Sequence, residues 1–182
     1  MKAVFPRTCT LLLAASLAGC ATTGGGGSAA GGTDVTTTHL GQPIARGQIA
    51  IQAFDPADVN MPEFPGYSAI VARELTRLGW TVVGSVGQAE QVALIDVQQG
   101  SRASLRGHLG GNAAAGASTG TATLLEVRIR RRSDGTVMWE GRAIADASAA
   151  TAPAERTAAV DRLAAALFRD FPGISGRTIR AR

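Results

Sequence analysis

The strongest constraint on the fold is an alternating pattern in residues 121–147. Leu125, Val127 and Ile129 alternate with charged residues, and the same pattern returns around Trp139 and Gly141. Successive side chains of a β-strand point to opposite faces, so the pattern predicts two strands. Each strand should have one apolar and one charged face. The segment between them contains Asp-Gly, which is typical of the turn of a hairpin.

The same alternation predicts the register of this hairpin. Directly opposed residues lie on the same face of a sheet, so odd-numbered apolar residues must face odd-numbered residues. A two-residue turn at Asp134 and Gly135 would break this rule. A three-residue loop, Ser133–Gly135, satisfies it and places Gly135 in the left-handed region. The predicted pairs are Arg128 with Glu140, Glu126 with Arg142, Ile129 with Trp139 and Val127 with Gly141.

Four arginines occupy five positions in the first strand and the turn, which raises the question of a nucleic-acid site. Arg128 is assigned to Glu140 by the register. Arg130, Arg131 and Arg132 remain at the hairpin tip and are the candidate contacts for an anion. The neighbouring residues are aliphatic, whereas single-stranded nucleic acid is commonly bound by stacking on aromatic side chains. We therefore expect no nucleic acid as a partner.

The N-terminus resembles a bacterial lipoprotein signal. Lys2 and Arg7 precede an apolar run at 8–18, which is shorter than the roughly twenty residues of a membrane-spanning helix. The run ends in LAGC, similar to a lipobox, and this implies a signal peptide at 1–19 and acylation of Cys20. The alternative is an ordinary cleaved signal beside a chance cysteine. Ala21, where an Asp would favour inner-membrane retention, indicates the periplasmic face of the outer membrane.

Removal of residues 1–19 takes away Lys2 and Arg7, so the net charge of +4 falls to +2 and every remaining cation is an arginine. Cys9 leaves with the signal and Cys20 carries lipid, so no disulfide is expected. Residues 20–45 are predicted to be the lipidated cysteine and a flexible Gly-rich tether, with a possible extended arm from 33.

Residues 46–182 are predicted to form a single domain. The expected order is β-α-β-β-β-β-α, which favours an α+β two-layer sandwich. Its mostly antiparallel sheet would have four or five strands, with two helices on one face. A Gly/Ala-rich loop at 103–120 is expected to be mobile or functional. The elements are strands at 48–54, 81–83, 92–98, 121–131 and 137–147, a helix from Gly66 that ends at Gly79 with Trp80 packed on Leu75, and a helix at 153–171.

No catalytic, cofactor-binding or metal-binding motif is found. A zinc site needs three or four closely spaced ligands, and the two histidines, His39 and His108, are far apart. Both are expected to be solvent-exposed. No Walker-type phosphate loop or nucleophile elbow is present. We therefore expect a non-enzymatic protein without cofactors or metals.

The order of several segments resembles the bacterial lipoproteins of domain-of-unknown-function family 4136. These are the lipobox, YSAIVARELTRLGW, AEQVALIDV, the Gly-rich insertion, SDGTVMWEGRA and ALFRDFPGISGRTI, and beyond the lipobox the resemblance covers about residues 34–180. The resemblance implies an α+β architecture and an envelope location. The family has no established catalytic residues to transfer. Trp139 and Gly141 are interpreted as packing positions, and the insertion lacks the aromatic residues often found there.

The expected function is that of an outer-membrane-anchored structural or accessory interaction module. Its partners would be the membrane, through the acyl chains, and an unknown envelope protein. The polar sheet face and the loop at 103–120 are the candidate contact surfaces. In the alternative function, Arg130, Arg131 and Arg132 bind anionic envelope components such as lipopolysaccharide phosphates.

Overall fold

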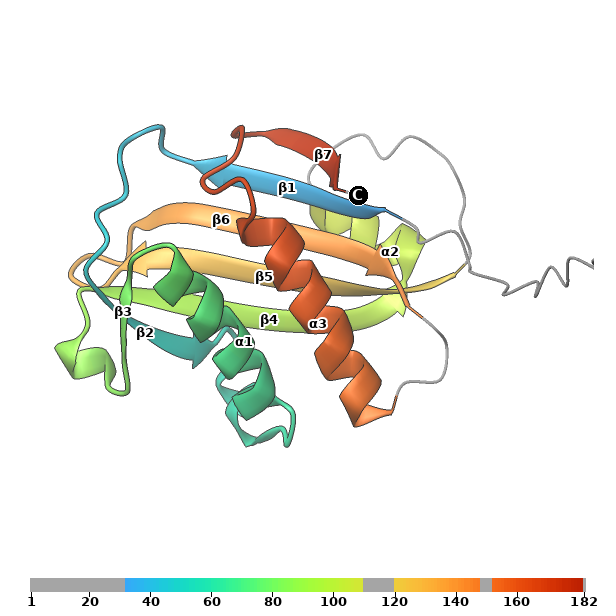
Figure 1. Ribbon diagram of the computed structural model, residues 1–182, viewed down its shortest axis with the longest axis horizontal. Coiled ribbons are helices and arrows are strands. Elements are labelled where there is room, and N and C mark those ends of the chain that lie inside the picture. Colours follow the sequence, from blue (N-terminus) through green and yellow to red (C-terminus); the bar gives the residue numbers. More distant parts are fainter. Residues whose placement is uncertain (1–31, 110–119, 148–151, 182) are drawn as a thin grey trace, which may run out of the picture.

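The computed structural model describes residues 32–109, 120–147 and 152–181. In this part of the chain, seven strands form one mixed sheet in the order β3-β2-β4-β5-β6-β1-β7 (Figure 1). The predicted signal peptide, Cys20 and the first part of the predicted tether, up to residue 31, lie outside the described residues. The strands are β1 (Thr33–His39), β2 (Gln48–Ala53), β3 (Thr81–Val83), β4 (Gln91–Ser101), β5 (Thr121–Arg131), β6 (Val137–Asp146) and β7 (Arg177–Ala181).

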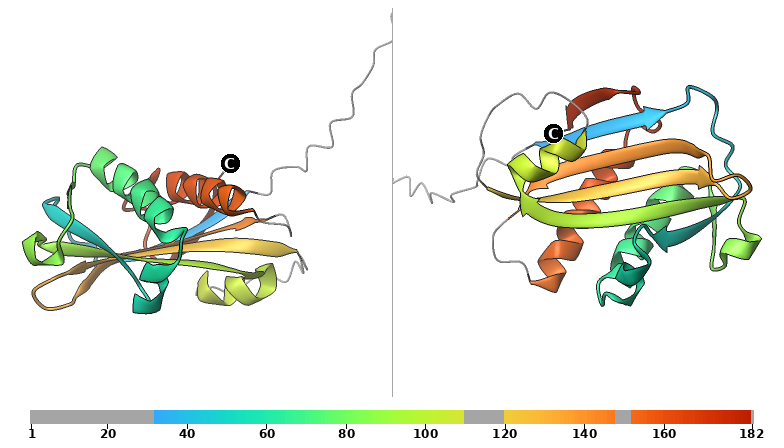
Figure 2. Two further views of the ribbon diagram at one scale, coloured as in Figure 1. Left: turned by 90° about the horizontal axis from the view of Figure 1, so that it is seen from below. Right: turned by 180° about the vertical axis from the view of Figure 1, so that it is seen from behind.

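Three α-helices accompany the sheet in the described residues. Helices α1 (Phe64–Arg77) and α3 (Pro153–Phe168) cover one face, and the short α2 (Arg102–Arg106) lies on the other face near one end (Figure 2). Short 3-10 helices occur at η1 (Pro56–Asn60), η2 (Val86–Gln88) and η3 (Gly107–Leu109). The predicted four- or five-stranded, mostly antiparallel sheet with two helices is therefore wrong.

Two strands that the predicted sheet lacked, β1 and β7, lie at one end of the sheet, with β7 at its edge. β1 lies between β6 and β7 and is antiparallel to both. Its sequence, TDVTTTH, has one buried apolar side chain, Val35, so it lacks the apolar alternation that reveals a strand. Thr and Val nevertheless favour extended backbone because they are branched at Cβ. The folded part thus begins before residue 46, within the predicted tether.

The other half of the sheet contains its parallel pairs. β2 is parallel to β3 on one side and to β4 on the other. The β2–α1–β3 segment is a helical crossover, which is the connection that parallel neighbours require. The predicted end of α1 is confirmed. Gly79 has a φ of +99°, and the Trp80 amide donates to the Leu75 carbonyl over 3.0 Å.

The predicted hairpin register is confirmed over most of its length. Every pair from Ala122 opposite Asp146 to Ile129 opposite Trp139 is as expected. A bulge then shifts the register, so that Arg130 faces Val137. The connection consequently differs from the predicted three-residue loop: the amide of Arg131 donates to the carbonyl of Thr136, and Gly135 donates back to Arg131. Gly135 has a φ of +72°, as predicted.

The main core lies between the sheet and helices α1 and α3. Trp139 is fully buried there and stacks on Phe168, with 5.5 Å between ring centroids. A Cβ at Gly141 would lie 2.2 Å from Cη2 of Trp139 and 2.8 Å from Cδ1 of Leu167. Gly141 is therefore the residue that lets the indole lie flat on the sheet. Trp139 and Gly141 are packing positions.

None of the helices in the described ranges is long and apolar enough to span a membrane.

Candidate functional site

The three arginines of the hairpin tip do not form one cluster. Arg131 binds Asp134 of its own turn over 2.7 Å. Arg132 donates through Nε to the carbonyl of Ala89 over 2.5 Å. Arg130 lies in β5 between Val92 and Val137. Two of the three guanidinium groups therefore already bind acceptors of the protein.

The charged face of β5 and β6 forms a closed ring of four ion pairs. Arg128 lies 2.5 Å from Glu126 and 3.0 Å from Glu140, while Arg142 lies 2.9 Å from Glu126 and 2.7 Å from Glu140. The two predicted cross-strand pairs are confirmed. Two arginines balance two glutamates, so this ring carries no net charge. Arg128 also lies over the ring of Phe54, at 4.4 Å.

Arg102 fixes α2 on this face of the sheet. Its side chain is buried and donates to Asp34 over 2.5 Å and to Asp146 over 2.6 Å. Burial alone lowers the pKa of Arg102, but the hydrogen bonds to Asp146 and Asp34 outweigh it and leave this pKa raised. Residues 103–109, expected to belong to a mobile loop, are therefore folded. A small second core includes Leu105, Leu109, Ala122, Leu124 and Ile144.

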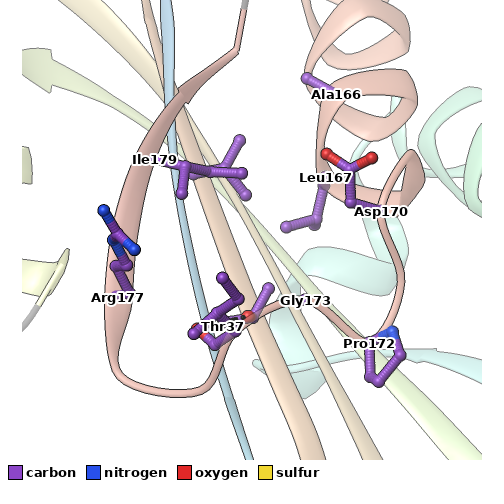
Figure 3. Close-up of a pocket in the computed structure, with 10 residues that line it drawn as sticks. Thr37, Ala166, Leu167, Asp170, Pro172, Gly173, Arg177 and Ile179 are labelled. Atoms are coloured by element: carbon purple, nitrogen blue, oxygen red, sulfur yellow. Dashed lines mark hydrogen bonds between the residues drawn. The ribbon is translucent and has the colours of Figure 1, made fainter.

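A cavity of about 340 Å³ lies beside the main core, between the end of α3 and the strands β1 and β7 (Figure 3). Leu167 from α3 and Ile179 from β7 point toward one another across it. The cavity exists because β7 extends the sheet beyond the part that α3 covers. Its apolar lining consists of Val35, Ala166, Leu167, Pro172, Ile174 and Ile179.

One wall of this cavity is the segment 172–176, which is held from outside by side chains and β1. Trp139 donates through Nε1 to the carbonyl of Pro172 over 2.9 Å. The Nε2 atom of His39 lies 3.3 Å from the carbonyl of Gly173, while its Nδ1 accepts from the amide of Gly41. This pattern requires the proton on Nε2. His39 therefore helps to hold this wall in place through Gly173. It is not the freely exposed histidine that was predicted.

Thr37 of β1 also holds this wall, through a hydrogen bond and a close contact. The Gly176 amide donates to the carbonyl of Thr37 over 2.8 Å. A Cβ at Gly173 would lie 2.5 Å from Oγ1 of Thr37, and Gly173 has a φ of +80°. Only glycine fits this position without strain. Hydrogen bonds and close contacts with β1 therefore hold the wall in its position.

The mouth of the cavity carries charges on opposite walls. Asp170 follows α3, and Arg177 begins β7 (Figure 3). Asp170 lies 3.2 Å from Arg169, so its charge is already balanced. Arg177 is exposed and has no ion-pair partner in the described residues. Ile174, at the rim, is 62% exposed. The arrangement can enclose an apolar group and place a positive charge at the entrance.

Sequence reasoning did not predict this cavity. Its lining comes from β1, β7 and the end of α3, and the sequence indicated β1 only as an extended arm without a place in the sheet. The sequence did single out Trp139, which binds the wall of the cavity, but only as a packing position. Within the described residues, no three His, Cys, Asp or Glu side chains gather as a metal site would require.

Comparisons with known proteins give a distant relative and a fold. No family model matches the chain. An uncharacterized protein of Zymomonas mobilis is 26% identical over 239 residues, covering 97% of this chain and 87% of that protein.

The crystal structure of a PDZ domain protein from Parabacteroides distasonis matches 82% of this chain with a TM-score of 0.51 and 13% identity. This chain spans 39% of that one. A PelC dodecamer structure from Paraburkholderia phytofirmans matches 72% of this chain and 93% of that chain, with 15% identity and a TM-score of 0.42. The likeness to the Parabacteroides protein extends to the fold alone.

Proposed function

We propose that this chain is a lipoprotein of the bacterial envelope whose folded part is a non-enzymatic binding module. Cys20 would carry the acyl chains, and the domain would face the periplasm from the outer membrane. The charged N-region, the short apolar run and the LAGC sequence support the anchor. The resemblance to domain-of-unknown-function family 4136 supports the same location.

The cavity between α3 and the β1–β7 edge is the proposed binding site. The observation that carries this proposal is the wall at 172–176, which Trp139, His39 and Thr37 hold in place. A cavity left by poor packing would tend to collapse, because lining atoms without neighbours lose dispersion contacts. A wall that is held open instead saves the ordering cost of binding.

The size and lining of the cavity agree with a ligand site. Ligand pockets typically occupy roughly 300–1,000 Å³ and combine apolar walls with a few polar groups. This cavity, at about 340 Å³, has mostly apolar walls and polar side chains from Thr37, Asp170 and Arg177. An apolar group that enters it removes its surface from water and gains free energy in proportion to that area.

The anchor is tested by Cys20→Ala. The change removes the thiol that accepts lipid, so labelling with radioactive palmitate should disappear and the protein should leave the membrane fraction. Cys9→Ala is the matched control, because Cys9 lies within the apolar run. If Cys20→Ala still takes up label, or if Cys9→Ala alone loses it, the proposed anchor is wrong.

The binding site is tested with Ala166→Phe, which places an aromatic ring in the cavity. The full chain would carry Cys20→Ser throughout, so that no acyl group of its own competes. We expect the neutral dye Nile red to bind saturably, one molecule per chain, and Ala166→Phe to lose this binding. Ala165→Phe is the control, because Ala165 is the exposed neighbour on the same helix. Equal binding by both variants, or none by the parent chain, contradicts the proposal.

A further inference from the structure

We infer that the ligand of the cavity is a single-chain amphiphile with an anionic head group, and that Arg177 contacts this head. The inference rests on the proposed binding function and adds the chemical class of the ligand. The tail would occupy the space between Leu167 and Ile179. The head would stay at the mouth, on the side of β7.

The volume of the cavity indicates the number and length of the acyl chains that the ligand can have. About 340 Å³ lies near the lower limit of ligand pockets. That space suits one acyl chain of medium length better than the paired chains of a phospholipid. The walls that would surround it are aliphatic, and each buried methylene contributes roughly equally to the affinity.

The charges at the mouth indicate the charge of the head group. Arg177 is exposed and, within the described ranges, carries no ion pair. Across the mouth, Asp170 lies beside Arg169 at 3.2 Å, so these two charges cancel. The entrance therefore has a net positive charge, and it is located on the strand side. A carboxylate or phosphate there would gain a charge-assisted hydrogen bond from the guanidinium group.

Heads of other charge fit the mouth less well. A cationic head would face Arg177 and would have to compete with Arg169 for Asp170. A zwitterionic head has the same competition for its cationic part. A neutral sugar head gains no ion pair. The expected order of affinity places carboxylate and phosphate heads first.

The test is displacement of Nile red from the full chain carrying Cys20→Ser. The competitors share a twelve-carbon tail and differ in the head: dodecanoate, dodecyl phosphate, dodecyl maltoside, dodecylphosphocholine and dodecyltrimethylammonium. All are used below their micelle-forming concentrations, with a protein-free blank. Dodecanoate and dodecyl phosphate should displace the dye at about fivefold lower concentration than dodecyl maltoside, the advantage typical of one exposed ion pair. Inorganic phosphate alone should not displace it, because it has no tail.

Two variants assign the preference to the mouth. Arg177→Gln should reduce the ratio between dodecanoate and dodecyl maltoside to about one, and Asp170→Asn should increase it by removing the carboxylate across the mouth. Arg180→Gln is the matched control, because Arg180 lies on the same strand but on the opposite face, facing Asp34 in the register. It should keep the preference of the parent chain.

The outcomes separate the two proposals. If Nile red does not bind, the cavity is not a ligand site and both proposals are wrong. If the dye binds and all five heads compete equally, the binding site stands and the anionic ligand is overturned. A preference for the cationic or zwitterionic competitor, or an anionic preference that survives Arg177→Gln, also overturns it.

Discussion

The two faces of the same pair of strands are built on different principles. Toward α1 and α3, β5 and β6 present fully buried apolar side chains, including Ile129 and Trp139. Toward α2, the intervening residues form the closed ring of ion pairs around Arg128 and Arg142. The alternation of a β-strand makes both faces consequences of one register. A slip by one residue would bury the charges and expose the indole.

The apolar face contributes most of the stability of the fold, whereas the charged face contributes to the specificity of strand pairing. Burying one large apolar side chain contributes roughly 1.5–3 kcal/mol. A partly exposed ion pair contributes about 1 kcal/mol or less, and its partners must be held in place at an entropic cost. We therefore expect the free energy of unfolding to depend mainly on the helix-covered face. The ring fixes which residues pair across the hairpin.

The largest effect is expected on the apolar face, from Gly141→Ala. The added Cβ would meet the indole of Trp139 at 2.2 Å and the side chain of Leu167 at 2.8 Å, and both residues are buried. Overpacking of this kind should lower the free energy of unfolding by about 3 kcal/mol, measured by urea denaturation. Gly84→Ala is the control, since a Cβ there meets no atom within 4 Å. A loss equal to that of the control would show that the indole can move freely.

Arg102→Met is expected to have the next largest effect on the free energy of unfolding. It removes the buried arginine of the polar face. It removes the partner of Asp34 and Asp146 and leaves Asp34 only the weaker contact with Arg106 at 3.6 Å. Breaking a buried pair is costly, but Asp146 is half exposed, so we expect a loss of about 2 kcal/mol.

Hydrogen exchange should localise this effect. The amides of α2 and η3 should exchange faster in Arg102→Met, while those of α1 remain as protected as in the parent chain. Arg106→Met should have a smaller effect in both measurements. Uniform loss of protection would mean that α2 unfolds only together with the whole domain.

The ion-pair ring itself should contribute less. A double-mutant cycle with Arg128→Met and Glu140→Gln isolates the pair at 3.0 Å from the rest of the ring. We expect a coupling free energy of about 0.5 kcal/mol that shrinks at high salt, because both side chains are partly exposed. A coupling as large as the loss caused by Gly141→Ala would abolish the distinction between the two faces.

The smallest expected effect concerns Glu63, which joins α1 to Arg156 of α3. The hydrogen bond from Arg156 and a backbone hydrogen bond lower the pKa of Glu63 below its ordinary 4.5, although burial opposes them. A lowered pKa stabilises the folded state above pH 4.5, and this contribution is lost as the pH falls through the folded pKa. Unfolding curves of the parent chain and Glu63→Gln should therefore differ at neutral pH and converge in acid. Glu155→Gln, on the exposed first turn of α3, should show no such convergence.

The parts of the fold that were predictable are those with strong apolar periodicity. Alternation in β5 and β6 determined the register, and the Gly79-Trp80 pair marked the end of α1. The bulge beside Arg130 was not predictable, because the alternation of apolar and charged residues does not indicate where an extra residue enters a strand. This one irregularity made the predicted loop one residue too short.

The edge of the sheet shows why the rest was missed. β1 and β7 are rich in Thr and Arg, and their pairing depends on residues more than a hundred positions apart, such as Val35 opposite Ile179. Local pattern carries no information on such pairs. Because the cavity is bounded by these two strands and α3, the candidate site became visible only with the sheet complete.

The position of β1 inside the sheet has a mechanical consequence. The first strand of the described chain is bonded on both sides, to β6 and to β7, and Thr33 lies opposite Ala181. A pull on the backbone at residue 32, directed along β1, must therefore shear two ladders of hydrogen bonds together. A strand at the edge could instead be peeled away one bond at a time. If the domain is tethered through its N-terminus, tension on the tether is borne by the interior of the sheet, and the helices are bypassed.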